Sequence, residues 1–137
     1  MTKVLIVDDH YIFRSSIRQI LLEEKDFYVM GEASNAEVLD NQMYTVGFDI
    51  LIIDITVNGT NGYEILSDAK RCNPDLKILV LGLNNEEEVA LRIINSGADG
   101  YITKDSVSKE LVYALRQICN NKKYTGLAVN NNFSPAV

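Results

Sequence analysis

The sequence has few of the residues that build disulfide frameworks, zinc sites or membrane spans. Only two of its 137 residues are cysteines, Cys72 and Cys119, and their wide separation matches no zinc-ligand spacing. We therefore expect no disulfide or zinc framework, and expect both cysteines to lie on helices as small hydrophobic residues. No apolar run approaches the roughly 18 residues of a membrane span, and the first residues lead into an apolar strand, not a signal peptide. These features predict a cytosolic location.

Positive charge is also scarce. The chain has 13 basic and 19 acidic residues, and its formal net charge is −6. Because binding to nucleic-acid phosphates needs a basic face, this piece is not expected to bind nucleic acid by itself. Its hydrophobic content of 47% suits one compact domain with a single core.

Short apolar runs alternate with helical patterns along the chain, which is typical of a parallel sheet covered on both faces. Strands are predicted near residues 4–7, 28–31, 50–53, 78–81 and 101–102. The run from Ile50 to Ile53 shows no alternation, as expected for a central strand buried on both faces. The pattern predicts an α/β fold.

Helices are predicted between these strands because apolar residues recur there at three- and four-residue spacing. They cover residues 13–21, 36–43, 63–72, 89–94 and 107–118. Asn35 is a suitable N-cap, Pro74 stops the third helix and Gly97 is a natural residue to follow the fourth. After Asn120 the periodicity is lost, so we expect a domain over residues 1–120 and a tail or linker over residues 121–137.

Polar residues follow the predicted strands at the points where they end. Asp8 and Asp9 end the first strand, Asp54 ends the third, Gly82 ends the fourth, and Lys104 follows the fifth. Since the carboxyl ends of parallel strands share one edge of a sheet, three carboxylates and an ammonium should converge there. A single aspartate in such a place is usually a loop residue or a helix cap, whereas the whole set is specific.

Three adjacent carboxylates cannot all stay ionised without a cation, because each raises the pKa of its neighbours. Mg²⁺ suits such a site, since it binds carboxylate oxygens and keeps several waters. Asp54 could then act as a nucleophile that forms an acyl phosphate. The cation and Lys104 would neutralise charge on the transferring phosphoryl group.

Two neighbouring residues leave alternatives open. His10, the only histidine, could bind a metal, but a solvent-facing position at the start of a helix is the favoured interpretation. Tyr101 could fill the core, or it could turn inward and outward as a switch beside the site.

These motifs resemble those of receiver domains of two-component response regulators, over Lys3 to about Ile118. The resemblance rests on Val4 to His10, on Asp54 with Gly59 and Gly62 after it, and on Gly97 to Asp105. The Asp-Asp-His opening, the Gly31-Glu32-Ala33 run and the Gly-Ala-Asp-Gly-Tyr run resemble the NarL/FixJ (LuxR-type) branch. This implies a flavodoxin-like, CheY-like three-layer sandwich, doubly wound, with five parallel strands in the order 2-1-3-4-5.

The resemblance also implies roles for residues. Asp54 would be the phosphoacceptor and Lys104 the phosphoryl contact. The Mg²⁺ ligands would be Asp8, Asp9, Asp54 and the backbone carbonyl of Thr56.

The resemblance implies a sensor histidine kinase as phosphodonor and makes a second copy of the chain a candidate partner. Control of transcription would act through a DNA-binding output domain that this sequence does not encode. A receiver separated from its output domain is favoured over a stand-alone regulator, and the domain would be regulatory, with no chemistry beyond its own phosphorylation and dephosphorylation.

The sequence departs from the family pattern at two places. Gly82 stands where the family has Thr or Ser, whose hydroxyl binds a phosphoryl oxygen, and Val57-Asn58 replaces Met-Pro. A hydrogen bond to a charged group contributes roughly 1.5–3 kcal/mol, whereas driving a switch from 1:99 to 99:1 takes about 5.5 kcal/mol. Loss of the hydroxyl could remove much of the switching energy while phosphoryl transfer remains possible.

Two alternative functions follow. The first is an atypical receiver that binds partners independently of phosphorylation, which Gly82 suggests. The second is a small Mg²⁺-dependent phosphatase, which would also need a general acid and a substrate pocket that the short loops do not provide.

Overall fold

The computed structural model describes residues 1–35, 47–54, 62–83 and 86–126. The predicted helix over residues 36–43, the loop that contains Val57-Asn58, and Thr56 lie outside these ranges. None of the described helices combines the length and the apolar composition that a membrane span requires.

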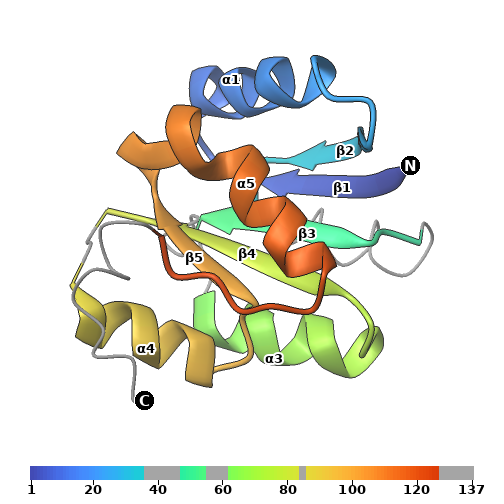
Figure 1. Ribbon diagram of the computed structural model, residues 1–137. Coiled ribbons are helices and arrows are strands. Elements are labelled where there is room, and N and C mark those ends of the chain that lie inside the picture. Colours follow the sequence, from blue (N-terminus) through green and yellow to red (C-terminus); the bar gives the residue numbers. More distant parts are fainter. Residues whose placement is uncertain (36–46, 55–61, 84–85, 127–137) are drawn as a thin grey trace.

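The described elements alternate between strands and helices, as the apolar pattern predicts (Figure 1). In chain order they are β1 (Thr2–Val7), α1 (Tyr11–Leu22), β2 (Phe27–Ala33), β3 (Ile50–Asp54), α3 (Gly62–Cys72), β4 (Lys77–Gly82), α4 (Glu87–Asn95), β5 (Gly100–Thr103), the short 3₁₀ helix η1 (Lys104–Ser106) and α5 (Val107–Cys119). Cys72 and Cys119 lie at the ends of α3 and α5, which confirms their helical placement, and both are exposed.

The five strands form one parallel sheet in the order β2-β1-β3-β4-β5, which confirms the predicted topology. Its register aligns the carboxyl ends of neighbouring strands, because Asp54 pairs with Leu81, and Gly82 pairs with Thr103. Residues that end different strands are therefore brought onto one edge.

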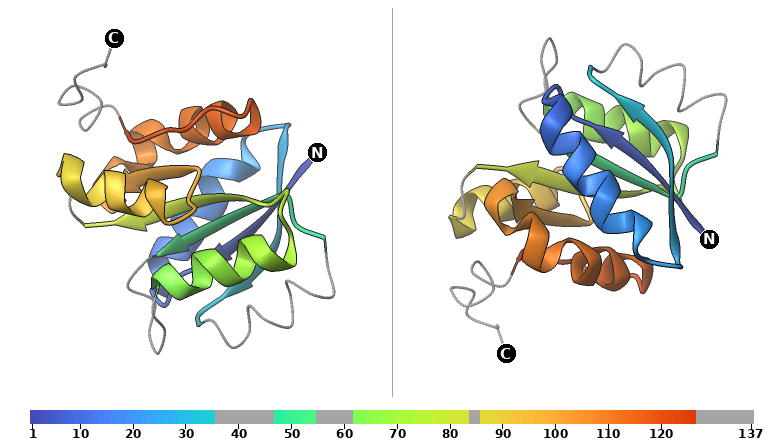
Figure 2. Two further views of the ribbon diagram at one scale, coloured as in Figure 1. Left: turned by 90° about the horizontal axis from the view of Figure 1, so that it is seen from below. Right: turned by 90° about the horizontal axis from the view of Figure 1, so that it is seen from above.

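Helices cover both faces of the sheet (Figure 2). On one face α1 and α5 contribute Ile17, Leu21, Leu111 and Leu115 to a buried cluster with β-strand residues. On the other face, α3 and α4 contribute Leu66, Ala69, Ala90 and Ile93 to a second cluster. All side chains of β3 are buried, as expected for a strand covered on both sides. The three-layer arrangement makes the sheet a rigid support for its carboxyl edge.

The packed part of the chain continues past the predicted boundary at residue 120. Asn121 takes a left-handed backbone conformation with φ 63°, which turns the chain after α5. The following residues 122–126, here called the strap, run beside β5. The backbone N–H of Tyr124 donates to the carbonyl of Asp99, and the N–H of Tyr101 donates to the carbonyl of Tyr124. The strap therefore packs against β5, while the division into a domain over residues 1–120 and a tail or linker over residues 121–137 stays a prediction.

Two side-chain contacts fix the strap. Tyr124 is buried, with 4% of its surface exposed, and its hydroxyl donates a 2.6 Å hydrogen bond to the buried Glu110 carboxylate. Lys123 lies 3.1 Å from the Asp99 carboxylate. Sequence periodicity could not show this, because the strap has neither strand alternation nor helical spacing.

Asp99 connects three parts of the fold. Its carboxylate accepts hydrogen bonds from Lys70 of α3, from the backbone N–H of Ile78 in β4 and from Lys123. Burial alone would raise the pKa of Asp99, but these donors outweigh it and hold that pKa below its usual range.

We expect Tyr124→Ala to lower the free energy of unfolding by about 3–5 kcal/mol, the usual cost of removing a buried aromatic ring. Urea denaturation of the whole chain measures it. The control is Tyr11→Ala, where the ring is 66% exposed and a change near 0.5 kcal/mol is expected. Equal effects of the two substitutions would contradict the packed strap.

Asp99 also predicts a pH dependence of stability. Because its pKa is lower in the folded chain than the ordinary value of 3.8, its charged form stabilises the fold above that pH, and the contribution is lost as the pH falls through the folded-state pKa. The difference in unfolding free energy between wild type and Asp99→Asn should therefore be largest near neutral pH and shrink below about pH 4. Exposed Asp75 provides the control, since the difference for Asp75→Asn should stay small throughout.

Candidate functional site

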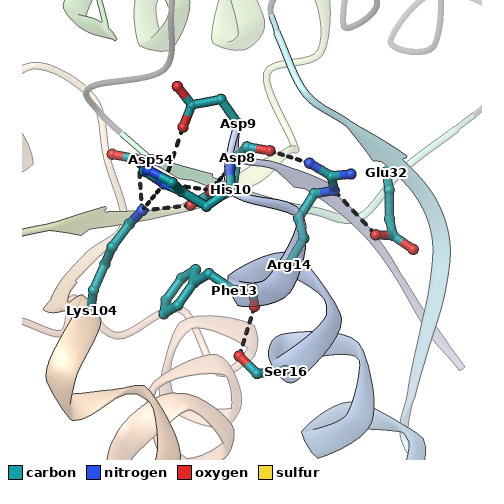
Figure 3. Close-up of polar contacts among 9 residues, drawn as sticks. All are labelled: Asp8, Asp9, His10, Phe13, Arg14, Ser16, Glu32, Asp54 and Lys104. Carbon is teal, nitrogen blue, oxygen red and sulfur yellow. Dashed lines mark hydrogen bonds and ion pairs between the residues drawn. The ribbon is translucent and has the colours of Figure 1, made fainter.

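Two buried carboxylates face one lysine at the carboxyl edge of the sheet (Figure 3). Asp8 follows β1 and Asp54 ends β3, and at most 1% of either residue is exposed. The Lys104 Nζ lies 2.8 Å from Oδ2 of Asp54 and 2.9 Å from Oδ2 of Asp8. The structure thus brings together residues that are far apart in the sequence, as strand-end convergence predicts.

Asp9 and His10 complete the cluster on its solvent side. Both residues are exposed, and the His10 Nδ1 lies 3.2 Å from Oδ1 of Asp9 and 3.4 Å from Oδ1 of Asp8. His10 is the N-cap residue of α1, and its backbone N–H donates a 2.7 Å hydrogen bond to Oδ1 of Asp8. The predicted exposure of His10 is confirmed, but its ring lies beside the carboxylates.

The donor set fits a divalent cation. One potential ligand atom from each of Asp8, Asp9, His10 and Asp54 lies within 4.8 Å of all the others. The cluster has three carboxylates and one lysine ammonium, which contacts Asp8 and Asp54, so two formal negative charges remain for a cation to balance. Carboxylate oxygens are the ligands that Mg²⁺ prefers, and the exposed side leaves room for the waters that this ion retains.

Lys104 is held in place from two directions. Burial would lower the pKa of its ammonium, but hydrogen bonds and attraction from Asp54 and Asp8 outweigh burial and raise that pKa. The Phe13 ring lies beneath it, with Nζ 4.6 Å from the ring centroid, a distance at which a cation is attracted to an aromatic face. Lys104 therefore stays charged and directed at the carboxylates.

Phe13 lies at the start of the helix predicted over residues 13–21, and the sequence pattern assigned it no part in the site. Its position three residues after His10 places it one helical turn further along α1, and this is the signal that could have revealed it.

Arg14 is a second supporting residue that the sequence did not reveal. Its guanidinium donates to the backbone carbonyl of Asp8 and lies 3.3 Å from the Glu32 carboxylate on β2. The contact links the turn after β1 to the neighbouring strand. It positions Asp8 without entering the carboxylate cluster.

Gly82 and Tyr101 form a close contact beside this cluster. The Tyr101 side chain is 1% exposed, and a Cβ placed on Gly82 would lie under 3.0 Å from the Oη, Cε1 and Cζ atoms of that ring. The inward ring therefore occupies the space that any side chain at position 82 would need. The sequence interpretation considered only the missing hydroxyl, whereas the structure adds a steric reason for glycine.

The predicted site residues thus fall into two adjoining groups. Asp8, Asp9, Asp54 and Lys104 meet in one cluster, and Gly82 meets Tyr101. Thr56 lies outside the described residues, so its backbone carbonyl stays a prediction. The roles of all these residues as ligands, phosphoacceptor or switch also stay predictions.

We expect Gly82→Ala to displace the Tyr101 ring toward solvent. The crowding atoms are the far end of a side chain that can rotate, so the chain should stay folded and lose about 1–3 kcal/mol of stability. ¹⁹F NMR of the fluorotyrosine-labelled protein, with the Tyr101 signal assigned by Tyr101→Phe, measures the exposure of the ring.

Gly47→Ala is the matched control, because a Cβ there meets nothing within 4 Å. Combining Gly82→Ala with Tyr101→Ala should cost less stability than the sum of the single changes, since the double variant removes the clash. If the stability losses of the two substitutions are additive, or if the Tyr101 signal is unchanged in Gly82→Ala, the inward position of the Tyr101 ring does not depend on glycine at position 82.

Comparison with known proteins agrees with this geometry. The model of the response regulator receiver domain family matches residues 4–116. The response regulator UvrY of Escherichia coli K12 is 33% identical over 124 residues, which cover 90% of this chain and 57% of UvrY. The nitrate/nitrite response regulator protein NarL of the same organism is 32% identical over 114 residues, which cover 83% of this chain and 53% of NarL. The chain therefore spans little more than half the length of these relatives.

Solved structures are similar over nearly all of the chain. The isolated receiver domain of RcsB from Salmonella enterica serovar Typhimurium, in its apo form, has a TM-score of 0.87 at 27% identity and covers 96% of this chain and 98% of its own. A structure of two RcsB dimers bound to two parallel DNAs has a TM-score of 0.87 at 28% identity and covers 95% of this chain and 66% of its own. With five parallel strands in the matching order and the acidic cluster at their carboxyl edge, the chain belongs to the response regulator receiver domain family, in its NarL/FixJ (LuxR-type) branch.

Proposed function

We propose that this chain accepts a phosphoryl group on Asp54 in a Mg²⁺-dependent reaction and thereby controls an output domain. The observation that supports this most directly is the contact of one lysine ammonium with both buried carboxylates, Asp54 and Asp8. A buried carboxylate beside a fixed positive charge and a cation site has the surroundings that transfer to an aspartate requires.

In the proposed transfer of a phosphoryl group from a donor phosphohistidine to Asp54, each residue of the site would have a separate role. Asp8, Asp9 and Asp54 would hold the cation, together with the carbonyl of Thr56. Bound there, Mg²⁺ would neutralise charge on the phosphoryl oxygens. An Asp54 carboxylate oxygen attacks phosphorus, the new O–P bond forms as the donor's N–P bond breaks, and the donor imidazole retains the electron pair of that bond. Lys104, held over Phe13, contributes a fixed positive charge to the transferred group.

A sensor histidine kinase is the proposed donor, since the receiver family implies one. For the whole protein we propose transcriptional control through a DNA-binding output domain, and pairing of two copies. The structure of RcsB dimers on DNA supports both parts by analogy. The net charge of −6 agrees with DNA contact through another domain, not through this one.

The phosphorylation-independent module is the weaker alternative. The missing hydroxyl at Gly82 suggested this alternative. The relatives reported above are response regulators, which favours a phosphoacceptor over a module that ignores phosphorylation. The cluster of Asp8, Asp54 and Lys104 is complete in this chain, which favours a phosphoacceptor.

We expect Asp54→Asn to abolish incorporation of a phosphoryl group from acetyl phosphate with Mg²⁺, because the amide is not a nucleophile. Intact-protein mass spectrometry detects the adduct. Lys104→Ala should reduce the rate by a factor of about 100 or more, as expected for loss of a charged group that stabilises the transition state. Removal of the cation with a chelator should stop the reaction in the wild type.

Asp68→Asn is the control, since Asp68 is an exposed aspartate whose carboxylate pairs with Arg71 on α3, away from the site. It should be labelled as fast as the wild type. An adduct of equal yield in Asp54→Asn would place the phosphoacceptor elsewhere.

A further inference from the structure

The His10 ring is positioned as if it belonged to the cation site. His10 Nδ1 lies between two carboxylates, 3.2 Å from Asp9 Oδ1 and 3.4 Å from Asp8 Oδ1. In an octahedral site with metal–ligand bonds of 2.0–2.1 Å, neighbouring ligand atoms lie about 2.9 Å apart. The distances from the nitrogen to each of the two oxygens are therefore only slightly longer than those between adjacent ligands of one small cation.

A contact with Lys104 indicates which way the nitrogen's lone pair points. His10 Nδ1 lies 3.3 Å from Nζ of Lys104. A lysine ammonium can only donate, so in the neutral ring with its proton on Nε2 the Nδ1 atom accepts this contact, whereas in a protonated ring Nδ1 would donate to Asp8 or Asp9. In the neutral ring the lone pair of Nδ1 faces the same space as the carboxylate oxygens, and a cation between these acceptors would be bound by all of them.

The backbone keeps the ring in this place. His10 has an extended conformation at the N-cap of α1, with φ −98° and ψ 104°, and its own N–H is bound to Asp8. Its side chain remains 67% exposed, so the ring can bind a metal without displacing core residues. Figure 3 shows it over Asp8 and Asp54, from the start of α1.

We infer that His10 is a ligand of the cation at this site and that it sets which cation the site prefers. The inference rests on the proposed function for the existence of the site, and adds a nitrogen ligand to a set otherwise made of oxygens. Imidazole favours later first-row metals, whereas Mg²⁺ prefers carboxylate, carbonyl and water oxygens. The site therefore binds Mn²⁺, and still more Ni²⁺, more tightly than an all-oxygen site would, while Mg²⁺ gains little.

The test measures binding of Mg²⁺, Mn²⁺ and Ni²⁺ to the full chain by isothermal titration calorimetry, in wild type, His10→Asn and His10→Gln. Loss of the imidazole should raise the Kd for Mn²⁺ and Ni²⁺ about tenfold or more, the scale seen when metal-site partners are removed. The Kd for Mg²⁺ should change by less than about twofold. Ile12→Asn, which changes an 83% exposed side chain two residues away, should leave all three values unchanged.

A spectroscopic measurement needs no variant to interpret. The chain has one histidine, so imidazole ¹⁴N modulation in the electron spin echo of the Mn²⁺-loaded wild type can come only from His10. Its absence, or unchanged Mn²⁺ affinity in both variants, would overturn the inference. Tighter binding of all three cations in the variants would also overturn it, because His10 would then be an imidazolium that competes with the metal.

These results separate the inference from the proposed function. If Mg²⁺ binds and Asp54 is phosphorylated while His10 has no effect, only the ligand role of His10 fails. If no divalent cation binds to the wild type, both the ligand role of His10 and the proposed cation-dependent phosphorylation of Asp54 are wrong.

Discussion

The ion pairs of Lys104 with Asp8 and Asp54 are the interaction on which the site depends. They join residues at the ends of three strands, from Asp8 after β1 to Lys104 after β5, and both carboxylates are buried. Burying two carboxylates is costly unless positive charge is close. One ammonium balances only part of the formal negative charge of the cluster, and the remaining charge would attract a cation. The packing of Phe13 and the anchoring of Asp8 by Arg14 keep this charged group in one geometry.

Much of this arrangement could be predicted from the sequence, because it follows from topology. The unbroken apolar run of β3 identified a central strand, and parallel strands place their carboxyl ends on one edge. Asp54 and Lys104 could therefore be brought together without coordinates. Helix faces were equally readable, since Ile17 and Leu21 of α1 and Leu111 and Leu115 of α5 are buried as their spacing predicts.

Other features depend on how side chains pack in three dimensions, and the periodicity of a single sequence does not reveal such packing. At Gly82 the sequence showed the loss of a hydroxyl, but only the structure shows that the Tyr101 ring takes the vacated volume. The ring of His10 is exposed, as its place at a helix start suggested, yet it turns toward the carboxylates. Tyr124 lies in a stretch without periodicity, so its burial against Glu110 had no local signal.

The strap runs toward the carboxyl edge of the sheet, where the carboxylate cluster lies. Tyr124 forms a parallel bridge with Gly100, so the chain runs in the same direction as the strands and, at Gly126, lies beside the backbone carbonyl of Tyr101 and the side chain of Ile102. A segment attached at that point starts out near the acidic edge, not at the opposite end of the sheet. Such an attachment raises the local concentration of whatever it tethers near the edge of the sheet that carries Asp54 and Lys104. The path of the strap thus determines which edge of the sheet the chain approaches at Gly126.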